Sequence, residues 1–101
     1  MAKANERKRR ESRPRSWVRI TSRFLTDLVY WIETDRVTAL KLVRLLQEIQ
    51  RDPFTGNGNP ERLKYNFRGC WSRRLIGEHR IVYEVSDEHV DVLAARYHYE
   101  N

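Results

Sequence analysis

The sequence predicts an α+β fold in which a small, mainly antiparallel β-sheet carries two N-terminal helices on one face. Two observations predict it. Apolar residues recur at three- and four-residue spacing over 22–51, and they alternate with polar residues over most of 61–99. The expected order is one strand, two helices and four strands, β-α-α-β-β-β-β. A chain of 101 residues can bury one core, so a single folded domain is expected.

The first half of the chain contains signals for one strand and two helices. Residues 17–21, WVRIT, are typical of a short strand. Ser22 is expected to cap a first helix. Asp35 is expected to cap a second helix, which must end before Pro53 because proline restricts the residue ahead of it. A tight turn at 33–35 makes the two helices antiparallel neighbours.

The second half contains strand signals. The loop 53–60 holds two glycines and two prolines and separates the helices from the strands. The candidate strands are 61–66, 71–76, 79–85 and 90–99. One hairpin turn is expected at 77–78 and another at 86–88.

The formal net charge of +6 is mostly a property of the N-terminus. Residues 1–16 contain seven Lys or Arg and two Glu, a balance of +5, so the remaining 85 residues carry only +1. We expect 1–16 to form a disordered basic arm and 17–101 to form the domain. Residues 61–80 are rich in Lys and Arg, whereas 81–95 contain neither. One face or edge of the domain should therefore be basic.

Composition argues against several classes of protein. The apolar runs are short and the N-terminus is charged throughout, so we expect no membrane span, no secretory signal and a cytoplasmic location. Cys70 is the single cysteine and the three histidines lack metal-ligand spacing, so no metal or other cofactor is expected. Ordinary packing is a better interpretation of Cys70 than a nucleophile, because nothing marks it as an exposed thiolate beyond nearby arginines.

A set of charged residues in the predicted strands suits RNA chemistry. Its members are Glu61, Lys64, Arg73, Arg74, Arg80 and His98. If they converge on one side of the sheet, a carboxylate can take the proton of a ribose 2′-OH and a histidine can protonate the leaving oxygen. Arginines can stabilise the phosphorane between them. A structural role remains the alternative, for example an ion pair between Arg80 and Glu78 or Glu84 across a hairpin.

Longer motifs connect these residues. Residues 59–83 read NPERLKYNFRGCWSRRLIGEHRIVY and 96–99 read RYHY, with YWIETD at 30–35 and IQRDPFTGNG at 49–58. This sequence resembles the YoeB/Txe toxins of the RelE/ParE superfamily over nearly all of 17–99. The resemblance implies a RelE-like fold and the toxin of a type II toxin–antitoxin pair. It also implies an mRNA interferase, an endoribonuclease that cuts mRNA in the A site of the 70S ribosome by metal-independent transesterification and inhibits translation.

The resemblance also implies roles and partners. Glu61 matches the general base, Arg80 the residue that steadies the scissile phosphate, and His98 the general acid. The implied substrate-binding residues are Lys64, Arg74 and Tyr99. The implied partners are a YefM-like antitoxin, the ribosome with its mRNA, and a second copy in a homodimer.

Two other functions are alternatives to the mRNA interferase, and the sequence departs from the family pattern in two places. A ParE-like inhibitor of DNA gyrase, which cuts no RNA, is the alternative in another class, and a catalytically inactive RNA- or antitoxin-binding module is a third. The set of Glu61, Arg80 and His98 favours the nuclease. The basic arm and the two residues after Tyr99 depart from the family pattern.

Overall fold

The computed structural model describes residues 13–64 and 69–97. The elements in chain order are β1 (Trp17–Ile20), α2 (Ser22–Thr34), α3 (Arg36–Arg51), β2 (Glu61–Arg62), β3 (Cys70–Ile76), β4 (His79–Val85) and β5 (His89–Ala94). This order confirms the predicted α+β fold. Within the described ranges, no helix is both long and apolar enough to cross a membrane.

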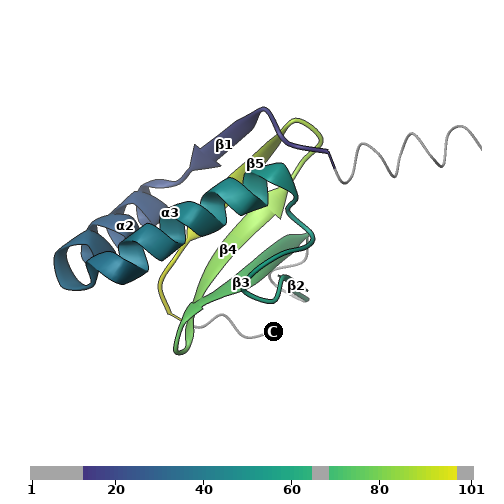
Figure 1. Cartoon of the computed structure of the whole chain (residues 1–101). Helices are drawn as coiled ribbons and strands as arrows, with labels where there is room; N and C mark the ends of the chain where they lie inside the picture. The colour runs from purple at the N-terminus through teal and green to yellow at the C-terminus, as the bar shows by residue number, and fades with distance from the viewer. Residues whose placement is uncertain (1–12, 65–68, 98–101) are drawn as a thin grey trace, which may run out of the picture.

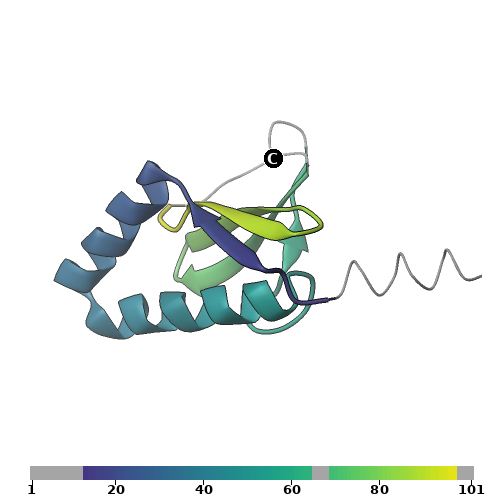
Figure 2. The same cartoon turned by 90° about the horizontal axis from the view of Figure 1, so that it is seen from above.

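The two helices meet at a single residue, Asp35. Its backbone N–H donates to the carbonyl of Trp31 at the end of α2, and its carboxylate accepts from the N–H of Thr38 at the start of α3 (3.1 Å). The predicted cap at Asp35 is therefore confirmed. The predicted cap at Ser22 is wrong, because Ser22 is already helical and Thr21 caps α2. Figure 2 shows α2 and α3 opening from their shared turn as a V.

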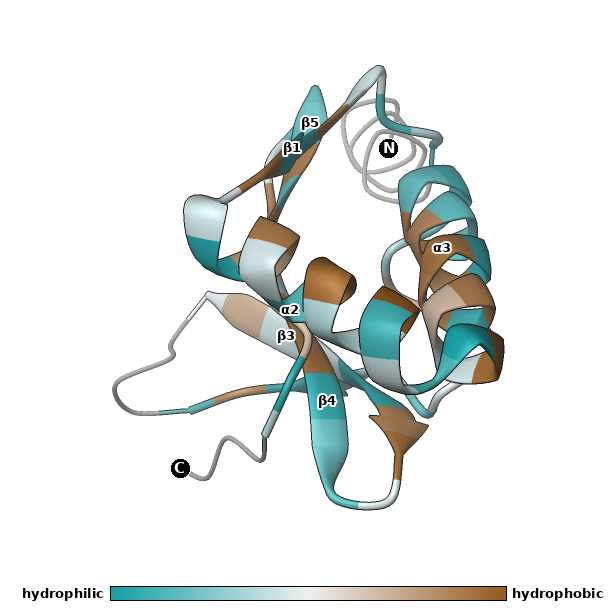
Figure 3. Ribbon diagram, turned by 90° about the vertical axis from the view of Figure 1, so that its left-hand side faces the viewer, coloured by the Kyte–Doolittle hydropathy of each residue, from teal (hydrophilic) through white to brown (hydrophobic). Residues whose placement is uncertain are grey.

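The five strands form one sheet in the order β1-β5-β4-β3-β2. β1 runs parallel to β5, and the other neighbours are antiparallel. Both helices pack their apolar sides on the same face of the sheet, and α3 crosses it in Figure 1. Figure 3 shows hydrophobic segments alternating with hydrophilic ones along both helices. Fully buried members of this core are Leu42, Ile49, Leu75, Ile81, Tyr83, Val90 and Val92. Burying each large apolar side chain stabilises the fold by about 1.5–3 kcal/mol.

Two strands are shorter than the alternation predicts. The expected strand 61–66 is wrong at 63 and 64, because β2 contains only two residues, and residues 65 and 66 lie outside the described residues. In the second half, β5 ends at Ala94. After Ala94 the backbone turns away from the ladder, and Tyr97 has a left-handed φ of 72°. The prediction of a strand over 90–99 is thus wrong at 95–97, because side chains of α2 and β4 bind the backbone of Ala95 and Tyr97 there. Residues 98 and 99 lie outside the described residues.

Residues 13–16, which the charge pattern assigned to the arm, lie against the domain. The N–H of Arg15 donates to the carbonyl of Gln50 (2.9 Å), and the Gln50 amide donates back to the carbonyl of Arg15 (3.0 Å). The buried guanidinium of Arg15 donates to the carbonyl of Ser86 (3.0 Å). This segment therefore joins the end of α3 to the turn between β4 and β5.

Candidate active site

Three of the predicted site residues lie on neighbouring strands at one face of the sheet. Glu61 of β2 pairs with Ser72 of β3, and Arg74 of β3 pairs with Arg80 of β4. Directly opposed residues point to the same face, as do residues two apart on one strand. Glu61, Arg74 and Arg80 therefore share one face, and Glu61 lies diagonally across from Arg74. The opposite face carries Leu75 and packs against the helices.

Arg73 belongs to the helix-covered face instead. Its guanidinium is fully buried and lies 3.6 Å from the carboxylate of Glu48. Its donors reach the carbonyls of Asp52 and Thr55 (both 2.8 Å), the carbonyl of Asn57 (3.1 Å) and the hydroxyl of Tyr83 (3.2 Å). The expectation that Arg73 joins Glu61 on one side is wrong, because adjacent strand residues face opposite sides. Arg73 instead anchors the loop that leads to Glu61.

Arg74 and Arg80 are two like charges in directly opposed positions. Within 13–64 and 69–97, no carboxylate forms an ion pair with either, so the alternative pairing of Arg80 with Glu78 or Glu84 is not found there. The Nη1 atom of Arg80 is buried and has no hydrogen-bond partner among the described residues. Opposed like charges destabilise a strand pair. The arrangement therefore favours an anion between them, such as a phosphate, to which guanidinium groups donate well.

Cys70 lies on the same face in a small apolar cluster with Leu63 and Val82. Burial and the neighbouring charge of Glu84 both raise the pKa of the Cys70 thiol. The raised pKa keeps Cys70 a neutral thiol, which supports the packing interpretation over a nucleophile. Among the described residues, no three His, Cys, Asp or Glu side chains come together as a metal site.

The described chain ends beside Arg80. The N–H of Arg80 donates to the carbonyl of Tyr97 (3.0 Å), and the N–H of Tyr97 donates to Nδ1 of His79 (2.7 Å). The predicted general acid His98 and the predicted substrate-binding residue Tyr99 lie outside the described residues. His98 follows Tyr97 directly in the sequence, and the carbonyl of Tyr97 is the group that accepts from Arg80 of β4.

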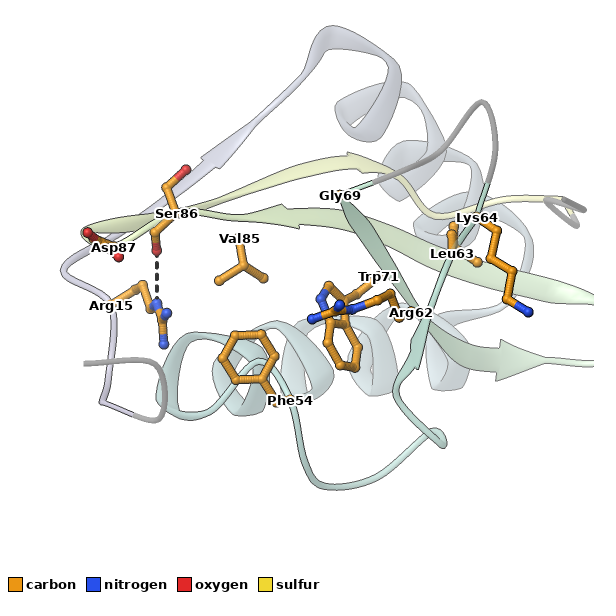
Figure 4. A pocket seen from close by; sticks show the side chains of 10 residues that line it. All are labelled: Arg15, Phe54, Arg62, Leu63, Lys64, Gly69, Trp71, Val85, Ser86 and Asp87. Carbon is orange, nitrogen blue, oxygen red and sulfur yellow. Dashed lines mark hydrogen bonds between the residues drawn. The ribbon is translucent and has the colours of Figure 1, made fainter. Parts of the chain in front are cut away.

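Lys64, which follows β2, borders an open groove of about 1030 Å³, whose lining does not include Glu61, Arg74 or Arg80. The lining residues are Arg15, Phe54, Arg62, Leu63, Lys64, Gly69, Trp71, Val85, Ser86 and Asp87. Figure 4 shows Phe54 and Trp71 in the middle of the groove, with Arg15 and Lys64 towards opposite ends. The guanidinium of Arg62 lies over the ring of Trp71, 5.4 Å from its centroid.

A family model described as the YoeB-like toxin of bacterial type II toxin–antitoxin systems matches residues 20–99, about four fifths of the chain. The chain belongs to this family. It is therefore a YoeB-like toxin, and the matched range includes every site residue that the motifs predicted.

Individual relatives agree with the family. The toxin YoeB of Mycobacterium bovis is 52% identical over 73 residues, which cover 72% of this chain and 86% of the relative. The solved YoeB dimer of Staphylococcus aureus has a TM-score of 0.75 at 35% identity and covers 87% of this chain and 100% of that one. The YoeB–YefM complex of the same organism has a TM-score of 0.74 at 35% identity and covers 84% and 99%.

Sequence reasoning missed the residues of this YoeB-like toxin that support the chain ahead of His98. These are Asp27 and Trp31 of α2 and His79 of β4, which bind the backbone of residues 95–97. One signal was present in the sequence. Asp27 is a carboxylate on the apolar side of α2, three residues after Phe24 and four before Trp31. A buried carboxylate needs a hydrogen-bond partner, so it marks a contact with another segment.

Proposed function

We propose that this YoeB-like toxin is a ribosome-dependent endoribonuclease that cuts mRNA in the A site and so blocks translation. One observation carries the proposal: Arg74 and Arg80 oppose each other on a face that they share with Glu61. Two cations and a carboxylate on adjacent strands match what cleavage by the ribose 2′-OH requires. The cations bind the phosphate, and the carboxylate accepts the proton of the nucleophile.

The reaction begins at Glu61. Its carboxylate takes the 2′-OH proton, and the 2′-oxygen attacks the adjacent phosphorus. Arg80, assisted by Arg74, stabilises the negative charge that develops on the phosphorane oxygens. His98 then protonates the departing 5′-oxygen. The products are a 2′,3′-cyclic phosphate and a 5′-OH.

The substrate itself supplies the nucleophile, so this mechanism needs no metal-activated water. A chelator of transition metals that spares the Mg²⁺ of the ribosome should leave the cleavage rate unchanged. We assign substrate binding to Lys64 and Tyr99 as well, with Lys64 acting from the groove beyond β2.

A YefM-like antitoxin is the proposed partner that binds and inhibits the toxin. The solved YoeB–YefM complex of Staphylococcus aureus supports it, because that toxin shares this fold at 35% identity. Co-expression with the antitoxin encoded beside this toxin should yield a complex that purifies intact and does not cleave mRNA.

We also propose that the toxin forms a homodimer, as YoeB of Staphylococcus aureus does in its solved dimer. The outer side of α2 offers an apolar surface for a partner. Leu25, Val29 and Ile32 are 51%, 44% and 46% exposed and lie at helical spacing. Exposed apolar patches of this kind mark interaction sites. Light scattering should give twice the mass of one chain.

Primer extension on mRNA in programmed ribosomes tests the main proposal. The toxin should produce cuts in the A-site codon, and naked mRNA should be cut much more slowly. Intact mRNA, together with DNA damage and filamentous cells on expression, would instead favour the ParE-like inhibitor of gyrase.

A further inference from the structure

Beyond β5, side chains of α2 hold the backbone of the C-terminal segment. The strand ends at Ala94, yet both polar backbone groups of Ala95 are paired. The N–H of Ala95 donates to Oδ2 of Asp27 (2.9 Å), and its carbonyl accepts from Nε1 of Trp31 (2.8 Å). Asp27 and Trp31 are 3% and 5% exposed. Both hydrogen bonds are therefore shielded from water. Removing one partner of a buried hydrogen bond is costly, because the other partner is left unsatisfied.

Two residues further on, β4 holds the chain in the same way. The N–H of Tyr97 donates to Nδ1 of His79 (2.7 Å), and its carbonyl accepts from the N–H of Arg80 (3.0 Å). A backbone N–H can only donate, so Nδ1 carries the lone pair and the neutral ring is protonated at Nε2. The His79 ring also meets the Trp31 ring edge to face, with centroids 4.9 Å apart. This contact links the α2 and β4 supports.

The segment between these supports has a backbone conformation that needs them. Tyr97 has a φ of 72°, which is disfavoured for a residue with a side chain and persists where the surroundings hold it. The guanidinium of Arg96 adds a further restraint, because it lies 3.5 Å from the ring centroid of Tyr30 and 4.6 Å from that of Tyr97.

We infer that Asp27, Trp31 and His79 form a C-terminal clamp, a set of positioning residues that fixes residues 95–97 and thereby directs His98 to the scissile phosphate beside Arg80. The inference rests on the proposed function, since it assigns the clamp to the placement of the general acid. A misplacement of about 1 Å costs a catalytic group about 100-fold in rate. The segment that the clamp holds ends at Tyr97, one residue before His98 in the sequence.

A matched pair of variants at His79 separates positioning from packing. His79→Leu keeps an apolar side chain of similar size but removes the acceptor for the N–H of Tyr97. His79→Asn restores an acceptor, because the Oδ1 atom of asparagine is bonded to Cγ, as the Nδ1 atom of histidine is. His89→Leu is the control, since His89 lies on β5 and contacts Asp91 (3.2 Å), not the C-terminal segment.

Cleavage of mRNA in programmed ribosomes should distinguish the three variants. We expect His79→Leu to lower kcat about 10- to 100-fold with KM within about twofold, because the clamp acts on chemistry and not on ribosome binding. His79→Asn should recover most of the rate, and His89→Leu should match the wild type. If His79→Leu unfolds, Trp31→Phe, which removes only the indole N–H donor and part of the ring, replaces it with the same expectation.

Amide hydrogen exchange tests the clamp without any cleavage assay. The N–H of Tyr97 should be protected in the wild type and in His79→Asn, and it should exchange faster in His79→Leu. Wild-type kinetics for His79→Leu, or an unprotected Tyr97 amide in the wild type, would overturn the clamp. A wild-type protein that cuts no mRNA but protects this amide would refute the proposed nuclease and leave the hydrogen-bonded clamp in place.

Discussion

At the scale of single residues, the proposed reaction depends on Glu61 and Arg80. Glu61→Gln removes the proton acceptor, which should lower the single-turnover cleavage rate by about 10²–10⁴. Arg80→Ala removes a donor to the phosphorane and should cost about 10²–10³. His98→Gln should resemble Glu61→Gln. The measurement is mRNA cleavage in programmed ribosomes at saturating toxin.

The matched control for these variants is Arg19→Ala. Arg19 lies on β1 at the far edge of the sheet, where its guanidinium pairs with Asp91 (2.6 Å). This variant should cut at the wild-type rate. All variants should keep the wild-type unfolding midpoint to within a few degrees. Wild-type cleavage by folded Glu61→Gln would remove Glu61 from the mechanism.

Glu48 should give the free energy of unfolding a defined pH dependence. Hydrogen bonds from the backbone and side-chain amides of Asn57 lower the pKa of the Glu48 carboxyl below its ordinary 4.5, and the charge of Arg73 lowers it further. The folded state therefore releases this proton at lower pH than the unfolded state. The stabilisation is complete above about pH 4.5 and is lost as the pH falls through the folded pKa.

Glu48→Gln should flatten the curve of unfolding free energy against pH below about pH 5. Urea unfolding at a series of pH values across that range measures this pH dependence. The control is Glu33→Gln, which removes an exposed carboxylate of α2. Parallel curves for wild type and Glu48→Gln would show that the contact of Glu48 with Asn57 is not maintained in solution.

At the scale of elements, the loop between α3 and β2 determines where Glu61 lies. The buried guanidinium of Arg73 donates hydrogen bonds to three backbone carbonyls of this loop. The N–H of Arg74 donates to a fourth, the carbonyl of Gly58 (2.6 Å). Gly58 has a φ of 84°, and a Cβ there would lie 2.9 Å from the carbonyl oxygen of Arg74. Only glycine fits, because the obstacle is strand backbone that cannot move away.

Gly58→Ala should therefore destabilise the fold by about 2–4 kcal/mol, from the disfavoured φ together with the clash. Gly77→Ala is the matched control. Gly77 also has a positive φ, 53°, but a Cβ there would meet nothing within 4 Å, so the cost should be about 1 kcal/mol. Chemical denaturation measures both. Equal losses would mean that the loop moves away from β3.

At the scale of the whole molecule, residues 13–16 connect elements that are distant in sequence. Arg15 is 4% exposed and contacts both the end of α3 and the β4–β5 turn. Arg15→Met should cost about 1–3 kcal/mol, because it leaves the partly buried carbonyls of Arg13 and Ser86 without this donor. Arg13→Met is the control. Arg13 pairs with Glu88 at the surface (2.7 Å), and such pairs contribute about 0–1 kcal/mol.

Thermal and urea unfolding of the two variants decide whether this segment is part of the folded domain. A larger loss for Arg15→Met than for Arg13→Met would place the start of the domain ahead of Trp17. Equal small losses would return residues 13–16 to the arm that the charge pattern predicts.

Local sequence pattern was enough to predict the order of the elements, both helices, the Asp35 cap and the turn at 77–78. These features depend on residues a few positions apart, whose spacing and turn chemistry are visible in the sequence. The motifs also identified the family, because a long run of matched residues is more specific than any single group.

Tertiary contacts decided the remaining features. The clamp joins Asp27 to Ala95 across 68 positions and Trp31 to Ala95 across 64, and such pairs leave no periodic signal. The same contacts end β5 at Ala94, where alternation alone continues the strand to 99. Arg73 and Arg74 are adjacent residues of the same type, so the sequence does not distinguish their roles. Arg73 lies on the side of β3 that the helices cover and is a buried anchor, whereas Arg74 lies on the other side and belongs to the candidate site.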